Sequence, residues 1–320
     1  MLVNSDKPER WKADIAQSVD LYNNWFLRFA PKAYRDTRLT TTQHVASALE
    51  LTANLTNFAP ILLQKNPGVL PILRMSTAPP IARDRLIGLA QVMPGLVKCM
   101  ELDQQIPPRL SKASLQAQLM KINETISKLV DKDIFTWLED SHKPMKEEVY
   151  RAATIVADRL CGAVADPIIR NAQEQRQLAY IKDWLEKRGY SYMKSGEGLK
   201  FDTMKPGTFS FRLNVPVKLL GGAKQINIPM DAVIMPLKSK AGEFPLLIEA
   251  KSAGDFTNVN KRRKEEATKI NQLQATYGKK VRYILFLCGH FDSGYLGYEA
   301  AEGIDWVWEH RIEDLCELGV

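Results

Sequence analysis

A continuous apolar run at Val281–Cys288, VRYILFLC, constrains the fold of this chain more than any other segment. A strand that is apolar on both faces has to be covered on both faces, as happens in a sheet flanked by helices. Shorter β patterns precede it at Phe209–Val217, Ile226–Pro236 and Pro245–Lys251, and a charged helix is predicted at Asn258–Tyr277. The second half of the chain is therefore predicted to be an α/β domain, with a mixed sheet flanked by helices.

The first half carries a different pattern, in which apolar side chains repeat every three to four residues. Amphipathic helices are predicted over Trp11–Phe29, Thr41–Phe58, Leu115–Val130 (capped by Ser111), Met145–Ala165 and Pro167–Gly189. Prolines between positions 60 and 108 divide the intervening stretch into short helices. We therefore predict an all-α N-terminal domain at 1–165 and an α/β domain at 166–320.

Composition excludes several classes of protein. The four cysteines lie far apart with no CxxC pair, which excludes a zinc ribbon or a thioredoxin motif. No apolar run approaches the roughly 18 residues of a membrane span, and the polar start does not resemble a signal peptide, so we expect a soluble cytoplasmic protein. The net charge of +7 suits a polyanionic partner.

Three polar residues interrupt two of the predicted strands: Asp231, Glu249 and Lys251. The strands are joined by a polar turn that contains Gly242. Paired as an antiparallel hairpin centred near residue 240, they place Asp231 opposite Glu249. Residues i and i+2 of a strand share a face, so Lys251 lies on the same side as Glu249. Two carboxylates and an ammonium group among apolar neighbours are costly unless they pair or bind a metal ion.

Such a set suits the hydrolysis of a phosphodiester. Two carboxylates bind Mg²⁺ through oxygen and leave positions for water and phosphate. The ion polarises the phosphoryl oxygen and lowers the pKa of its water. A lysine beside it orients the water, and its charge stabilises the anion that develops. The same three residues are equally compatible with an ordinary surface hairpin held by salt bridges.

The segments around these residues resemble the PD-(D/E)xK nuclease signature. Ile228-Pro-Met-Asp231 and Leu247-Ile-Glu-Ala-Lys251 carry that resemblance, with Met230 between the usual proline and aspartate. More closely, the second half resembles type II restriction endonucleases, and the whole chain resembles the XamI family. The further segments that carry this resemblance are Arg170-Asn-Ala-Gln-Glu-Gln-Arg-Gln177, Leu185-Glu-Lys-Arg-Gly189, Asn260-Lys-Arg-Arg-Lys-Glu-Glu266, Gln272-Leu-Gln-Ala-Thr-Tyr-Gly278 and Ala78-Pro-Pro-Ile-Ala-Arg-Asp-Arg-Leu86.

The resemblance implies a restriction-endonuclease-like core that cuts double-stranded DNA with Mg²⁺ at a short palindromic site. Asp231 and Glu249 would bind the metal ion, and Lys251 would position the attacking water. A glutamate on the helix before the sheet often joins such a site. Glu174 is a better candidate than Glu186, with an ordinary solvated charge on the helix as the alternative. A palindromic site implies a two-fold homodimer, and a cognate DNA methyltransferase would protect host DNA.

Contacts to DNA are predicted in two places. The basic segment after the third strand carries candidate phosphate ligands at Lys261, Arg262, Arg263, Lys264 and Lys269, followed by Gln272. Glu265 and Glu266 follow Lys261 and Arg262 at a spacing of four residues, so pairing within the helix is the alternative. In the helical domain, Arg83 and Arg85 are candidate readers of guanine, with ordinary structural roles as the alternative.

Two other functions remain open at this point. A repair or recombination nuclease with the same core would act on branched or damaged DNA without a fixed sequence. A DNA-binding protein in which the three residues are structural would tolerate Lys251→Ala. A Cys288–His290 nucleophile is a weaker alternative, because Cys288 falls in a buried strand.

Overall fold

The computed structural model describes residues 2–140, 142–196, 198–218, 225–240, 242–256 and 259–320, without the side chains of 163–166 and 259–263. The chain forms two compact units. Unit 1 comprises Met1–Phe29 and Arg170–Val320, and unit 2 comprises Ala30–Ile169. The predicted boundary near residue 165 lies close to the second of these borders.

The first 29 residues belong to unit 1, whereas the sequence pattern placed them in the helical domain. The backbone N–H groups of Asn4 and Ser5 each donate to the Asp305 carboxylate, both at 3.0 Å. Trp11 meets Trp306 edge to face, with 5.5 Å between ring centroids. These partners are about 300 positions away in sequence, so a pattern that reads only local periodicity does not detect them.

Two helices are longer than predicted. Helix α1 spans Pro8–Leu51 and joins the two helices predicted in this range, with Pro31 inside it. Helix α8 spans Lys146–Glu186 and continues through Pro167, where a break was predicted. A proline removes one hydrogen bond from a helix interior, but its fixed φ is a helical value. Long amphipathic stretches on both sides therefore outweigh it here.

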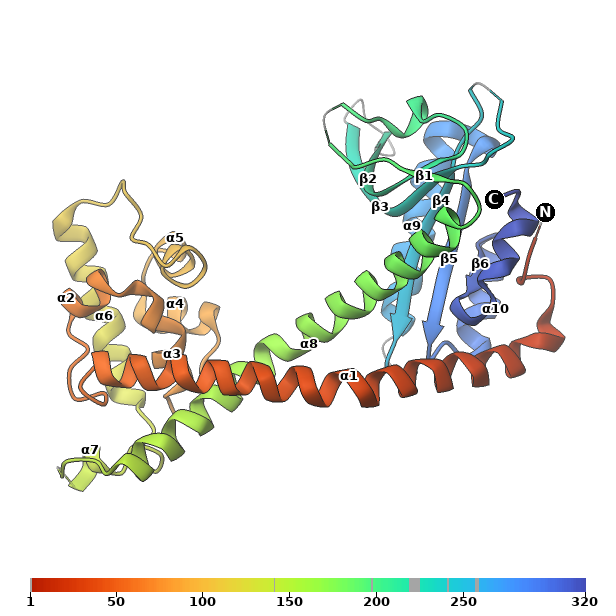
Figure 1. Ribbon diagram of the computed structural model, residues 1–320. Coiled ribbons are helices and arrows are strands. Elements are labelled where there is room, and N and C mark those ends of the chain that lie inside the picture. Colours follow the sequence, from red (N-terminus) through yellow and green to blue (C-terminus); the bar gives the residue numbers. More distant parts are fainter. Residues whose placement is uncertain (1, 141, 197, 219–224, 241, 257–258) are drawn as a thin grey trace. The chain divides into compact units, whose positions relative to one another are not determined.

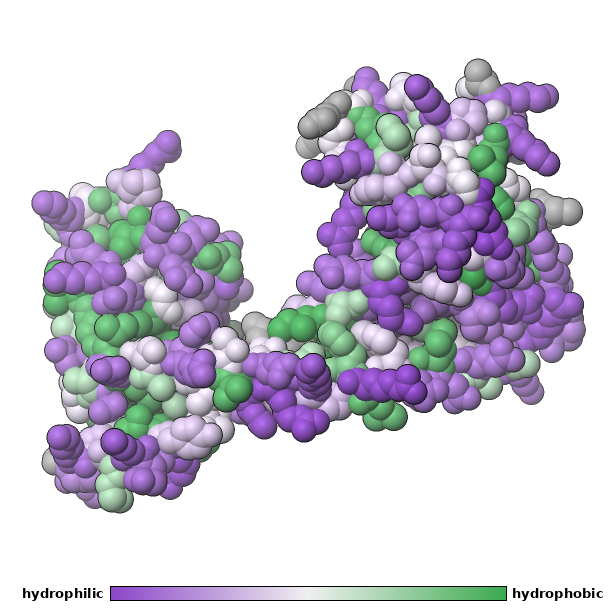
Figure 2. All heavy atoms as spheres, viewed as in Figure 1, coloured by the Kyte–Doolittle hydropathy of each residue, from purple (hydrophilic) through white to green (hydrophobic). Residues whose placement is uncertain are grey.

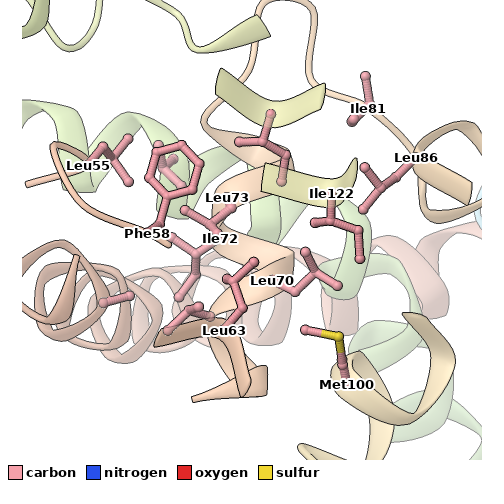
Figure 3. Packing of buried hydrophobic residues seen from close by; sticks show 14 of the residues in the cluster. Leu55, Phe58, Leu63, Leu70, Ile72, Leu73, Ile81, Leu86, Met100 and Ile122 are labelled. Carbon is pink, nitrogen blue, oxygen red and sulfur yellow. The ribbon is translucent and has the colours of Figure 1, made fainter. Parts of the chain in front are cut away.

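Unit 2 contains the second part of α1, the first part of α8 and, between them, further helices around one core. These further helices are α2 (Pro60–Lys65), η1 (Pro67–Val69), α3 (Leu70–Met75), α4 (Arg83–Ala90), α5 (Pro94–Lys98), η2 (Cys99–Asp103), α6 (Lys112–Leu129) and α7 (Trp137–Asp140). Ser111 caps α6 as predicted, accepting a hydrogen bond from the Ser114 N–H group. Figure 3 shows Phe58, Leu63 and Leu70 among the buried side chains of this core.

Unit 1 contains a mixed sheet, as predicted (Figure 1). Its strands are β1 (Ser191–Tyr192), β2 (Thr208–Lys218), β3 (Gln225–Met235), β4 (Leu246–Ala253), β5 (Arg282–Gly289) and β6 (Asp305–Trp308), and they follow this order across the sheet. The β2–β3 and β3–β4 pairs are antiparallel. The β4–β5 and β5–β6 pairs are parallel, so the site described below lies where antiparallel pairing gives way to parallel pairing.

Helices cover both faces of this sheet. On the first face, here named the α8 face, Ile181 and Leu185 pack with Ile248 and Phe286. On the second, the α9 face, helix α9 (Val259–Tyr277) packs through its apolar residues. The remaining elements are α10 (Ser293–Ala301) and the helical turns η3 (Phe201–Thr203), η4 (Gly278–Lys280) and η5 (Glu309–Leu318). The side of α8 that faces away from the sheet, near Ile181 and Leu185, is mainly hydrophilic (Figure 2).

The sequence predicted that the apolar run at Val281–Cys288 would be covered on both faces, and the packing of β5 confirms this. Ile284 and Phe286 lie on the α8 face, and Leu285 and Leu287 lie on the α9 face. Every one of these side chains is buried because each face has its own helical layer.

Within the described residues, no helix is long and apolar enough to cross a membrane.

Candidate active site

The three residues singled out in the sequence meet where two strands part. Pairing between β3 and β4 includes Val233↔Leu247 and ends at Ala232↔Ile248, the register that the hairpin prediction required. One residue further, Asp231 lies on the strand position opposite Glu249. There the N–H group of Ala250 donates to Asp231 Oδ2 at 2.8 Å. A side-chain carboxylate thus takes the hydrogen bond that a backbone carbonyl would accept in a regular ladder.

Glu249 is buried among cations, with only 6% of its surface exposed. Its Oε1 atom lies 3.1 Å from Lys251 Nζ and 2.5 Å from Lys269 Nζ. Its Oε2 atom is buried and has no hydrogen-bond partner among the described residues. Because a buried carboxylate oxygen without a partner is costly, this atom is a ready ligand for a cation.

Lys251 lies between two carboxylates. Besides Glu249, its Nζ atom contacts Glu266 Oε1 on α9 at 3.0 Å. Burial by itself would lower the pKa of this ammonium group, but Glu249 and Glu266 outweigh that effect, and the pKa is raised above its ordinary value. Lys251 is therefore a cation in this state, which suits electrostatic stabilisation better than proton abstraction.

Glu266 has a partner that the spacing along the helix did not suggest. It is completely buried and contacts Lys251, whereas the side chain of Arg262, the alternative partner, lies outside the described residues. The signal was present in the sequence, because Glu266 lies four residues before Ile270 and seven before Leu273, the two core residues of α9. A carboxylate on the apolar face of an amphipathic helix calls for a buried cationic partner.

The Asp231 carboxylate has a strongly perturbed acidity. Burial and the neighbouring charge of Glu249 raise its pKa to about 6, against an ordinary value of 3.8. The Ala250 N–H group and Lys251 oppose this shift, and Glu174 adds to it. Carboxylates crowded in this way repel each other when both are ionised, and a divalent cation between them would remove that repulsion.

Glu174, the predicted third acid, lies on α8 and bonds Arg212 of β2 at 2.8 Å. Its charge acts on Asp231, so the structure brings it into the same electrostatic group. Glu186 instead pairs with Lys182 of its own helix at 3.8 Å. Of the two glutamates, Glu174 is the one whose charge acts on Asp231, and its role in the site stays a prediction. Arg212 was not singled out in the sequence, because isolated arginines in strands carry no local signal.

The predicted DNA ligands of α9 fall into three groups. Lys269 bonds Glu249 inside the site instead of standing free at the surface. Lys264 is exposed and Gln272 is half-buried, and within the described residues neither side chain bonds the site. The side chains of Lys261, Arg262 and Arg263 lie outside the described residues.

In unit 2, Arg83 donates from Nε to Glu101 Oε2 at 2.9 Å, while Arg85 is exposed. Glu101 is also bound by the buried Arg74. Arg83 thus has a structural partner, whereas Arg85 is the more exposed of the two predicted base readers.

Cys288 is not placed as a nucleophile. Burial and the neighbouring charge of Glu309 raise the pKa of its thiol far above the ordinary value. Arg176 approaches the sulfur at 3.5 Å and pairs with Glu309 at 2.6 Å. The group links α8, β5 and the start of η5, which is a packing role.

The donors fit a hard divalent cation of the Mg²⁺ type. Asp231 and Glu249 supply carboxylate oxygens, one of them the unpartnered Oε2 of Glu249. In the described part of the chain, no group of three or more His, Cys, Asp or Glu residues is arranged to hold a metal ion. Mg²⁺ binds through one or two carboxylates and keeps several waters, so two carboxylates are sufficient.

Comparisons with known proteins point to one family. The family model described as XamI restriction endonuclease matches residues 53–308. The type II restriction enzyme SalI of Streptomyces albus G is 54% identical over 318 residues, which cover 99% of this chain and all of the relative. A crystal structure of the Vibrio cholerae protein VC1899 aligns with 90% of this chain and 56% of its own, at 13% identity and a TM-score of 0.29, too low to inform the fold.

Proposed function

This chain belongs to the XamI restriction endonuclease family, and from that premise we propose how its site cuts DNA. The protein is a site-specific type II restriction endonuclease. Its substrate is double-stranded DNA, and its second half has a restriction-endonuclease-like core. The observation that carries the assignment of the site is the convergence of Asp231, Glu249 and Lys251 at the point where β3 and β4 part.

Asp231 and Glu249 hold Mg²⁺ in this proposal. When bound, the ion polarises the phosphoryl oxygen and lowers the pKa of a water molecule. To bind the metal ion, Glu249 would exchange part of its bonding to Lys251 and Lys269. Its Oε2 atom, which has no hydrogen-bond partner among the described residues, is the oxygen available for this. Glu174 is the further acid whose charge acts on Asp231, and we include it in the acidic group of the site.

Lys251 orients the attacking water and stabilises the negative charge that develops on the phosphate. Its raised pKa keeps it protonated, so the charge is present when the phosphate arrives. Glu266 is a positioning residue, because it continues to hold the ammonium group when Glu249 turns to the metal ion. The long lysine stem is thereby fixed before the reaction, which lowers the entropic cost of alignment.

We assign the helical unit 2 a role in DNA contact, in subunit contact, or in both. Phosphate contacts fall to Lys264 and to Lys261–Arg263 of α9, and base contacts to Arg83 and Arg85. A palindromic recognition site would call for a two-fold homodimer. Such an enzyme acts in the cytoplasm, where a cognate methyltransferase protects host DNA.

The test is digestion of unmethylated phage DNA in Mg²⁺ and in EDTA. We expect discrete fragments in Mg²⁺ alone. Lys251→Ala should lower the cleavage rate by roughly a thousandfold, within the range known for electrostatic and acid–base groups. Lys187→Ala, which removes an exposed lysine in the turn after α8, is the matched control and should cut normally.

Each contrary outcome has its own meaning. A metal-dependent smear would contradict cleavage at a fixed sequence. Normal cutting by Lys251→Ala would contradict the assigned site while leaving the family membership intact.

A further inference from the structure

Arg212 has a backbone conformation that is unusual for a strand. Its φ is +52°, in the left-handed region, although it lies in the middle of β2. The left-handed conformation is unfavourable for any residue other than glycine, because its Cβ atom approaches the backbone too closely. Residues held in such strained conformations concentrate at functional sites. The strain coincides with the site, because Arg212 lies between the pairs Phe211↔Ala232 and Leu213↔Met230, across from Asp231 on β3.

The strained residue changes which way the strand faces. Phe209 and Phe211 pack on the α8 face, whereas Leu213 and Val215 pack on the α9 face. In a regular strand, residues two apart share a face, so the alternation is shifted at Arg212. The strand therefore contributes core residues both before and after Arg212, while the Arg212 side chain itself is 58% exposed.

The guanidinium group is held at the site by one carboxylate. Arg212 Nη2 donates to Glu174 Oε1 at 2.8 Å, and Glu174 acts electrostatically on Asp231. The pair is open to solvent, since Glu174 is 33% exposed, and exposed ion pairs contribute little to stability. Such a pair can exchange partners at low cost, unlike the buried pairs of Lys251.

We propose that Arg212 binds a phosphate of the cut DNA strand, with Glu174 as the partner that holds its guanidinium group in place before DNA arrives. The inference rests on the proposed function of this site. A guanidinium group matches the geometry of a phosphate and binds it through two hydrogen bonds, which a lysine cannot reproduce. When DNA arrives, the guanidinium group would exchange Glu174 for the phosphate.

The test uses DNA binding in a Lys251→Ala background, so that the duplex stays intact at constant Mg²⁺. Each phosphate contact of a cation contributes about −0.9 to the slope of log affinity against log salt concentration. Arg212→Asn should weaken binding and make this slope shallower by about 0.9 for each subunit bound. Asparagine tolerates the left-handed conformation, so the variant should fold with an unchanged melting temperature.

Three companion variants separate this role from a structural one. Glu174→Gln breaks the same ion pair from its other side and should leave the slope unchanged. Arg212→Lys keeps the charge and should largely keep the slope. Arg188→Asn breaks an exposed pair with Glu313 elsewhere in unit 1 and should also leave it unchanged.

An unchanged slope in Arg212→Asn overturns the inference, whatever the melting temperature. An equally shallower slope in Glu174→Gln would also overturn it, because that variant removes no cation from the DNA interface. Neither result would affect the proposed function, which is tested by cleavage with the otherwise unaltered enzyme.

Discussion

Replacing Asp231 by asparagine should stabilise the metal-free protein at neutral pH. The pKa of Asp231 is raised to about 6 in the folded state, against an ordinary value of 3.8, because burial and Glu249 disfavour its charge. A carboxyl group shifted in this direction supports folding fully below its unfolded pKa, and this support is lost as the pH rises through the folded pKa. Ionised Asp231 is therefore a cost to folding above about pH 6.

The full shift corresponds to about 3 kcal/mol at 1.36 kcal/mol per pKa unit. Solvent that reaches this partly exposed carboxylate reduces the effect, so we expect Asp231→Asn to gain about 1–3 kcal/mol at about pH 7.5. The amide oxygen can still accept the hydrogen bond from the Ala250 N–H group. The gain should grow by up to about 2 kcal/mol between about pH 4.5 and pH 7.5.

Urea unfolding in EDTA at several pH values measures this directly. Asp183→Asn, at an exposed position on α8, is the matched control and should show no such trend. Added Mg²⁺ should stabilise the parent enzyme more than Asp231→Asn, because the variant keeps only one of the two carboxylates that we propose as ligands of the ion. A variant that is less stable than the parent at about pH 7.5, or a gain that shrinks as the pH rises, would refute the reasoning.

Two more predictions concern buried groups. Glu266→Ala should lose about 3 kcal/mol of unfolding free energy, since it leaves Lys251 with one carboxylate fewer in a buried site, whereas Glu265→Ala on the exposed side of α9 should lose less than about 1 kcal/mol. Equal losses in urea unfolding would contradict the assigned pair. A thiol reagent should label exposed Cys316 in the native enzyme and reach Cys288 only after unfolding, without loss of cleavage from native labelling. Inactivation that follows rapid labelling of Cys288 would instead make this thiol part of the reaction.

The features of the site that lower the stability of the metal-free protein are the ones that we propose for metal binding, and these experiments measure the two effects separately. Asp231 and Glu249 repel each other, and the buried Oε2 atom of Glu249 finds no hydrogen-bond partner in the described part of the chain. Both features cost folding free energy in the metal-free protein, and both prepare the site for a divalent cation. Lys251 and Lys269 offset part of the cost by pairing with Glu249.

Local sequence patterns were sufficient to predict much of the secondary structure and strand pairing of unit 1. The apolar run of β5 required two covering layers, and the hairpin symmetry about residue 240 gave the register that aligns Asp231 with Glu249. Period-two and period-3.6 patterns report which face of an element is buried, and a hairpin links two strands that are close in sequence. The register of β3 and β4, and with it the proximity of the three residues that we propose as catalytic, could therefore be predicted from the sequence.

The remaining features depend on contacts between distant segments, which leave no period in the sequence. The first 29 residues join unit 1 through Asp305 and Trp306, the buried partner of Lys251 comes from α9, and Glu174 meets Arg212 across two elements. The left-handed conformation of Arg212 is likewise a property of the packed sheet, because arginine by itself avoids it. Residue types and spacing determined which groups could perform the chemistry, and tertiary packing decided which charges neutralise one another and which are left free to bind.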